Sequence, residues 1–234
     1  MDRDLVRRAS AEAVGTAFLV AIVVGSGIAA QRMSPGNTGL QLLESSIATG
    51  AGLIALILAI GPISGAHFNP VVTLADRVLG GTSTRELGWY VVAQFAGACV
   101  GVMVANLMFE LAPVELSTHT RSSPALWLGE FVATFGLLMV ILGVVRAGRV
   151  QVAAFAVGGY IAAAYWFTSS TSFANPAVTV GRTLTDTFAG IRPSSAPMFI
   201  VMQVAGGLAA VALAHFWRPH IPAADLVMPH EGSP

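Results

Sequence analysis

The sequence predicts an all-α membrane protein in which six transmembrane helices and two re-entrant half-helices form an inverted repeat. Three observations lead to this fold class: a composition poor in charge, six long apolar stretches, and two Asn-Pro motifs in corresponding places. Of the 234 residues, 55% are hydrophobic and 10% are charged. Soluble domains carry about 25% charged residues, so most of this chain is expected to be solvated by the lipid bilayer.

The charged residues and the cysteine exclude several classes of function. Twelve basic residues balance 12 acidic residues, for a net charge of 0, and there is no basic run. We therefore expect no nucleic-acid partner. The chain has one cysteine, Cys99, which excludes an internal disulfide and a cysteine-based metal cluster. Neither a metal site nor a cofactor is predicted.

Six stretches have the length that a membrane crossing requires, which is about 20 mostly apolar residues for roughly 30 Å of hydrocarbon. They are residues 11–30, 46–62, 87–109, 125–145, 150–168 and 196–217. An even number of crossings places both termini on the same side. We expect residues 1–220 to form a single domain and residues 221–234 to form a disordered cytoplasmic tail.

The first stretch has two interpretations. A charged start, an apolar run and small residues also fit a cleavable secretory signal. Glu12 lies inside the apolar run, and the same pattern recurs later in the chain, which favours an uncleaved helix. Eight arginines fall on the side of the N-terminus, and four are assigned to the other side: Arg32, Arg121, Arg182 and Arg192. This excess predicts that both termini are cytoplasmic.

The two halves of the chain match each other at three places in the same order. The matches are Glu12–Thr16 with Glu130–Thr134, Asn69–Thr73 with Asn175–Thr179, and Gln94–Ala98 with Gln203–Gly207. They define repeats over about 10–110 and 125–217. Each repeat has three crossings, so the second copy enters the membrane from the opposite side. Transport proteins with inverted repeats bind their substrates near the membrane midplane, between the repeats.

The Asn-Pro motifs predict two short helices that begin inside the membrane. Asn is a favoured N-cap and Pro a favoured first helical residue. The segments that follow, 69–79 and 175–186, are too short to cross the bilayer at 1.5 Å per residue. The loops before them, 62–68 and 168–174, would place irregular backbone at membrane depth, which is tolerated where it is buried in protein or lines a water-filled cavity.

At these motifs the chain resembles the aquaporin and aquaglyceroporin (major intrinsic protein) family. The residues that carry the resemblance are Ser64-Gly65-Ala66-His67-Phe68-Asn69-Pro70-Val71 and Ser172-Phe173-Ala174-Asn175-Pro176-Ala177. The resemblance extends from Glu12 to about Phe216. It implies a right-handed, aquaporin-like bundle that assembles as a homotetramer with one pore in each subunit.

The two half-helices would aim the positive ends of their dipoles at one point, which opposes the passage of cations. The expected pore midplane consists of Asn69, Pro70, Val71, Asn175, Pro176 and Ala177. Backbone around Gly65, Ala66, His67, Thr171 and Phe173 is expected to supply acceptors along the pore. The resemblance gives Glu12 and Glu130 the role of holding the two loops, and we expect His67 to make an orienting hydrogen bond.

The resemblance also places a selectivity filter on the extracellular side of the two Asn residues. Counting from the Asn residues, its four positions are Thr49, Ala163, Ser172 and Val178, with Tyr160 one helical turn from Ala163. The family commonly has Arg where this chain has Val178, and Ala where it has Val71. Because Arg is bulky, charged and rich in donors, its replacement predicts a mouth that is wider, uncharged and less polar.

These features predict a passive channel for small uncharged solutes such as water and glycerol-like polyols. A bacterial subgroup associated with arsenic resistance is similar in having Asn-Pro-Ala-Val, which implies arsenite or methylated arsenicals as permeants and a bacterial plasma or inner membrane. The alternative is an ion-coupled secondary transporter, since inverted repeats with broken helices also occur there. An intramembrane enzyme would need a nucleophile with a base, or a metal centre, and the sequence suggests neither.

Overall fold

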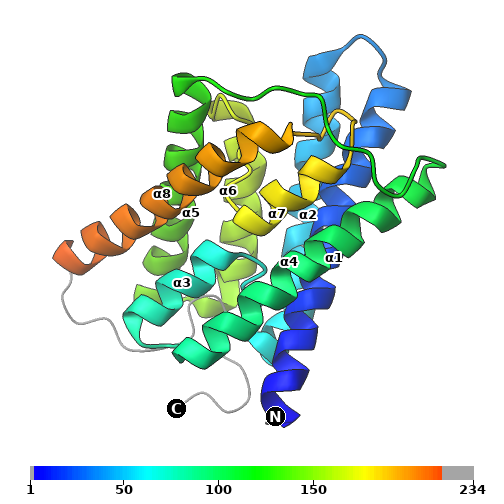
Figure 1. Cartoon of the computed structure of the whole chain (residues 1–234). Helices are drawn as coiled ribbons and strands as arrows, with labels where there is room; N and C mark the ends of the chain where they lie inside the picture. The colour runs from blue at the N-terminus through cyan, green and yellow to red at the C-terminus, as the bar shows by residue number, and fades with distance from the viewer. Residues whose placement is uncertain (1–2, 218–234) are drawn as a thin grey trace.

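The computed structural model describes residues 3–217, which form a bundle of long helices around two short ones (Figure 1). Six helices in this part of the chain are long and apolar enough to cross a membrane. They are α1 (Arg3–Met33), α2 (Thr38–Ser64), α4 (Thr84–Met108), α5 (Pro124–Arg146), α6 (Ala153–Phe167) and α8 (Ala196–Trp217). The spans of α6 and α8 include the 3-10 turns that precede them, η1 (Val150–Val152) and η3 (Pro193–Ser195). The predicted six-span, all-helical fold is confirmed. The predicted tail, 221–234, lies outside the described residues.

Local sequence explains where several helices begin and end. The Ser83 side chain accepts a hydrogen bond from Glu86 N and the Glu86 side chain accepts one from Ser83 N, so a capping box starts α4. Ser123 caps α5, and Pro124 is its first residue. Gly65 ends α2 with a left-handed φ of 85°, a conformation that glycine adopts without steric cost.

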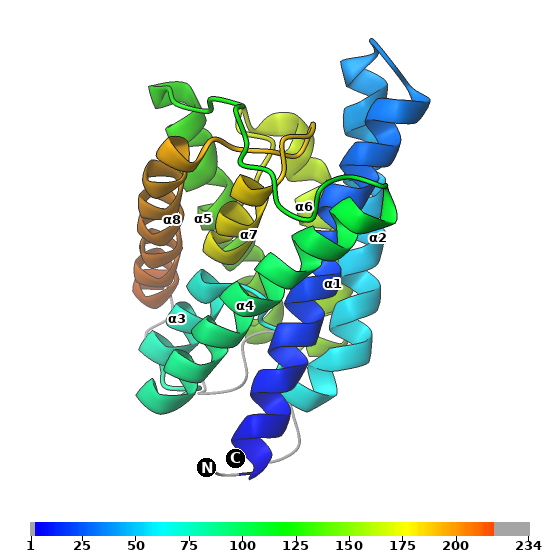
Figure 2. The ribbon, with the colours of Figure 1, turned by 45° about the vertical axis from the view of Figure 1, so that its right-hand side comes forward.

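The helices pack as two equivalent sets of three. Helix α1 contacts α2 and α4, helix α5 contacts α6 and α8, and α2 packs against α6 to join the sets. Figure 2 shows α3 (Pro70–Leu79) in the lower half and α7 (Pro176–Gly181) in the upper half of the bundle. Each half-helix also contacts the last long helix of the other set, α3 with α8 and α7 with α4. The two repeats therefore interlock through their short helices.

Glycines allow the closest helix contacts, again at equivalent places. A Cβ on Gly97 of α4 would overlap the carbonyl oxygen of Ala13 in α1, and a Cβ on Gly206 of α8 would overlap that of Phe131 in α5. Helix backbones can approach this closely only when no side chain intervenes. We call the end of the bundle that carries Arg3 and Trp217 the terminal end, and the opposite end, with residues 34–37, 109–123 and 185–195, the loop end (Figure 2).

Candidate functional site

Two irregular loops lead into the half-helices. Each loop has three residues with positive φ at equivalent places: Gly65, Ala66 and Phe68 at 85°, 51° and 49°, and Thr171, Ser172 and Ala174 at 61°, 50° and 50°. A left-handed conformation costs a non-glycine residue roughly 1–2 kcal/mol. The loops therefore depend on their surroundings to keep this shape.

Glu12 on α1 holds the first loop. Its carboxylate, which is fully buried, accepts hydrogen bonds from His67 N at 2.9 Å and Phe68 N at 2.6 Å. The hydroxyl of Ser64 and the side-chain amide of Gln94 also donate to it, at 2.7 Å and 2.8 Å. A carboxylate has only acceptors, so one side chain satisfies several buried donors at once.

Glu130 on α5 does the same for the second loop. Its carboxylate accepts hydrogen bonds from Phe173 N and Ala174 N, both at 2.9 Å, and from the side-chain amide of Gln203 at 2.5 Å. Gln203 also donates to Thr179 Oγ1 at 2.8 Å, as Gln94 does to the equivalent threonine of the first repeat. The Glu and Gln residues that match between the two halves of the sequence therefore form the same hydrogen-bond network in each repeat.

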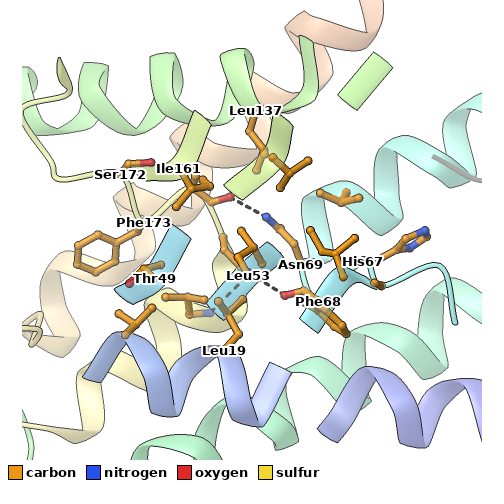
Figure 3. Close-up of a pocket in the computed structure, with 18 of the residues that line it drawn as sticks. Leu19, Thr49, Leu53, His67, Phe68, Asn69, Leu137, Ile161, Ser172 and Phe173 are labelled. Carbon is orange, nitrogen blue, oxygen red and sulfur yellow. Dashed lines mark hydrogen bonds between the residues drawn. The ribbon is translucent and has the colours of Figure 1, made fainter. Parts of the chain in front are cut away.

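Asn69 and Asn175 tie the two half-helices together. The Oδ1 atom of each caps its own half-helix, accepting from Val71 N and Ala177 N at 2.9 Å in both cases. The Nδ2 atom of each donates to the opposite loop: Asn69 to the carbonyl of Ala174 at 2.8 Å, and Asn175 to that of Phe68 at 2.7 Å (Figure 3). An amide group has two N–H donors, so one donor on each Asn is left for a solute.

A narrow cavity of about 60 Å³ runs past these two Asn side chains (Figure 3). One water needs roughly 10–15 Å³ of such space, so the cavity can hold a short file of small molecules. Its wall is mostly apolar and includes Leu19, Leu53, Ile57, Leu137, Ile141 and Ile161. Polar groups from the loops, from Thr49 of α2, from Tyr165 of α6 and from Arg182 just after α7 interrupt this wall. The cavity suits a solute that has both apolar and hydrogen-bonding surface.

The predicted midplane and loop residues divide into two groups. Asn69, Asn175, Ala66, His67 and Phe173 line the narrow cavity. The others do not: Pro70, Val71, Pro176 and Ala177 are the first residues of the half-helices, Gly65 caps α2, and Thr171 lines a wider cavity at the loop end. Nδ1 of His67 lies 3.2 Å from Thr73 Oγ1. Residues 3–217 contain no group of three side chains that could hold a metal ion.

Three of the four predicted filter residues, Thr49, Ser172 and Val178, line the cavity, but Ala163 does not. Ala163 is exposed on the outer face of α6. The residues of α6 that line the cavity are Val157, Ile161 and Tyr165. They are spaced by four and share one helix face, whereas a residue midway between two of them points about 200° away.

Tyr165 takes the place that was predicted for Ala163. Its hydroxyl lies 3.1 Å from Thr49 Oγ1, and both side chains are buried. Ser172 Oγ, also buried, has no hydrogen-bond partner within residues 3–217. Tyr160, the other α6 residue considered, donates to the carbonyl of Ala133 at 3.1 Å and is absent from the lining.

The prediction of an uncharged mouth is wrong, because Arg182 lies in the cavity wall. Helix α7 is shorter than the predicted segment 175–186 and continues as a 3-10 turn, η2 (Arg182–Leu184). Arg182 N donates to the carbonyl of Val178, which places Arg182 one turn beyond Val178. The four-residue spacing of Val178 and Arg182 is a signal in the sequence for this placement, but the count of arginines used Arg182 only to assign the outer side of the membrane.

A second cavity, of about 240 Å³, lies at the loop end and shares Tyr165 and Arg182 with the wall of the narrow one. At this end the segments 109–123 and 185–195 are joined by hydrogen bonds: Asp186 accepts from Thr118 N at 2.8 Å and from the Thr118 hydroxyl. These hydrogen bonds hold the pKa of Asp186 below its usual value, and the bond from the Thr118 backbone N–H has the largest effect. The loops around the mouth are therefore fixed to each other.

Comparison with known proteins gives a consistent result. The family model for the major intrinsic protein matches residues 2–172 and 143–231. Aquaglyceroporin AqpS of Rhizobium meliloti (strain 1021) is 50% identical over 210 residues, which cover 90% of this chain and 89% of that protein. A probable aquaporin, AqpM of Archaeoglobus fulgidus, is 30% identical, with 92% and 98% covered.

Among solved structures, the aquaglyceroporin from Plasmodium falciparum has a similar fold. Its TM-score to this structure is 0.68 at 23% identity, with 91% of this chain and 95% of that chain covered. The family match and the two relatives together span nearly all of the described helices. The chain therefore belongs to the major intrinsic protein family of passive membrane channels, and not to a class of enzymes.

Proposed function

We propose that this channel conducts glycerol and similar small polyols, together with water, along the narrow cavity between the two loops. The observation that carries the proposal is the cavity wall, which is largely apolar but offers hydrogen-bonding groups at one place after another. Beside the Asn pair and the Thr49 and Tyr165 hydroxyls, Ser172 lines this path, and its buried hydroxyl has no hydrogen-bond partner within residues 3–217. A polyol has a hydrocarbon side and a row of hydroxyls, so it can use both kinds of wall. The relative from Rhizobium meliloti, named an aquaglyceroporin, supports the same class of permeant.

The polar groups of this wall do not favour ion coupling, which the alternative carrier would require. A carrier needs a group at the midplane that titrates or binds a cation. The two buried carboxylates near the midplane, Glu12 and Glu130, are already occupied by backbone and side-chain donors and are absent from the cavity lining. Neutral Asn amides occupy the point where the half-helices meet.

Arsenite, as the uncharged hydroxide, is a second candidate permeant. Its three hydroxyls present donors and acceptors as glycerol does. Val178 stands in the wall where the family commonly has Arg, and the arsenic-associated subgroup shares this Val. We include methylated arsenicals in the proposal for the same reason.

The experiment that tests the proposal is stopped-flow swelling of proteoliposomes with water, glycerol and arsenite. We expect protein-dependent fluxes that rise in proportion to the solute gradient and do not respond to a pH gradient or an uncoupler. Protein-free liposomes are the control. A glycerol flux that saturates at moderate concentration, or one that needs the pH gradient, would support the carrier instead.

We further propose that the chain is a homotetramer in a bacterial plasma or inner membrane, with its termini in the cytoplasm. The tetramer and the membrane follow from the family resemblance, and the orientation from the arginines at the terminal end. Those within the described residues are Arg3, Arg7, Arg8, Arg77, Arg85, Arg146 and Arg149. Light scattering of the detergent-solubilised protein should give four chains per particle, and a monomeric mass would contradict this arrangement.

A further inference from the structure

Arg182 carries a buried charge in the wall of the channel. Its side chain is 4% exposed, and within residues 3–217 it makes no ion pair. Its guanidinium carbon lies 3.4 Å from the ring centroid of Phe173, and its Nε donates to the carbonyl of Ala189. Buried arginines are nearly always paired with an acid, so an unpaired one in a channel wall needs an explanation.

The donors of Arg182 are only partly used. Within residues 3–217, the side chain makes a single hydrogen bond, through Nε, and the two terminal nitrogens have no protein acceptor. The side chain lines both the narrow and the wide cavity. Arg182 therefore belongs to the wall of both cavities, and its terminal N–H groups can donate hydrogen bonds to a solute in the channel.

Arg121 provides a contrast at the same end of the bundle. It lies over the same ring, with its guanidinium carbon 5.3 Å from the Phe173 centroid. Its Nε and Nη2 donate to the carbonyls of Gly190 and Phe188, at 2.9 Å and 3.3 Å. Arg121 lines the larger cavity but not the narrow one. Its hydrogen bonds hold the loop at Phe188–Gly190, whereas Arg182 lines the narrow cavity through which solutes would pass.

We propose that Arg182 is the selectivity-determining cation of this channel, displaced one helical turn outward from the position at which the family commonly has its Arg. Its fixed positive charge, in surroundings of low dielectric constant, repels cations at the mouth before they reach the half-helix tips. Its free N–H groups donate hydrogen bonds to the oxygens of a neutral solute. Val178 makes the family's usual Arg position apolar. The positive charge of the mouth is instead supplied by Arg182, one helical turn further out.

This inference rests on the proposed function, and its test separates the two. Proteoliposomes are prepared with wild type, Arg182→Gln, Arg182→Met and Arg182→Lys, and each is assayed for water flux, glycerol flux and proton influx. Arg192→Gln, which removes an exposed arginine at the same end, is the matched control. Water flux reports that each variant is folded.

We expect Arg182→Gln and Arg182→Met to conduct water and to raise proton influx about tenfold or more, because a nearby unit charge changes the barrier by at least that factor. Arg182→Lys should keep the exclusion, and Arg192→Gln should match wild type. If both neutral variants conduct water but their proton influx stays at the wild-type level, the inference is overturned. Loss of water flux in every Arg182 variant would also overturn it, since the residue would then be structural. Absence of glycerol flux in wild type would instead contradict the proposed function.

Discussion

Replacing Glu130 by Leu is expected to destabilise the folded channel strongly. Leu is close to Glu in size but accepts no hydrogen bond, so Phe173 N, Ala174 N and the Gln203 amide would lose their acceptor. Each buried unsatisfied donor costs about 1–3 kcal/mol. Three of them amount to about 3–9 kcal/mol, against a typical net stability of about 5–15 kcal/mol. The strained loop would also lose the contact that holds its left-handed residues.

The measurement is thermal unfolding in detergent, with the yield of monodisperse protein as a second readout. Glu130→Gln retains one acceptor oxygen and should be intermediate. Glu115→Leu is the matched control, because Glu115 is exposed at the loop end and its substitution should leave the midpoint nearly unchanged. If Glu130→Leu unfolded at the same temperature as wild type, the carboxylate would not be what holds the second loop.

Local patterns predicted most of the fold. Apolar length specified the six long helices, and the Asn-Pro pairs specified where α3 and α7 begin, because capping depends on a few adjacent residues. The family resemblance assigned Glu12 and Glu130 to hold the two loops, and both carboxylates accept hydrogen bonds from loop backbone. The matching Gln residues indicated only the repeat. Two boundaries were less visible: α1 and α2 begin about eight residues before the predicted spans, at Arg3 and Thr38, since polar residues extend a helix beyond the apolar core without an apolar signal.

The filter was harder to predict because it depends on how neighbouring helices are rotated and where a short helix stops. Counting back from Asn175 gave Ala163, but the face of α6 that α2 and α5 leave open to the cavity carries Ile161 and Tyr165. Arg182 was missed because α7 turns into η2 at this residue and brings the guanidinium over Phe173. That contact joins two residues at opposite ends of the half-helix α7, nine positions apart, and no local pattern encodes it.

Attaching a bulky group at position 178 is expected to close the channel. Val178 is 4% exposed and lines the narrow cavity one turn before Arg182. A Val178→Cys side chain would therefore meet solutes and reagents that enter the path. A methanethiosulfonate reagent with a negative group suits this position, because the Arg182 guanidinium attracts it. The disulfide-linked adduct would fill a cavity that admits only a short file of small molecules.

The central claim is that solutes pass through the cavity between Asn69 and Asn175, and glycerol swelling before and after labelling tests it most directly. The assay uses a Cys99→Ala background, since Cys99 is partly accessible on α4, and compares Val178→Cys with Ala163→Cys. We predict that the reagent abolishes glycerol flux in Val178→Cys, that reduction restores it, and that Ala163→Cys is unaffected because position 163 faces away from the cavity. Full flux through labelled Val178→Cys, or block through Ala163→Cys, would contradict the account.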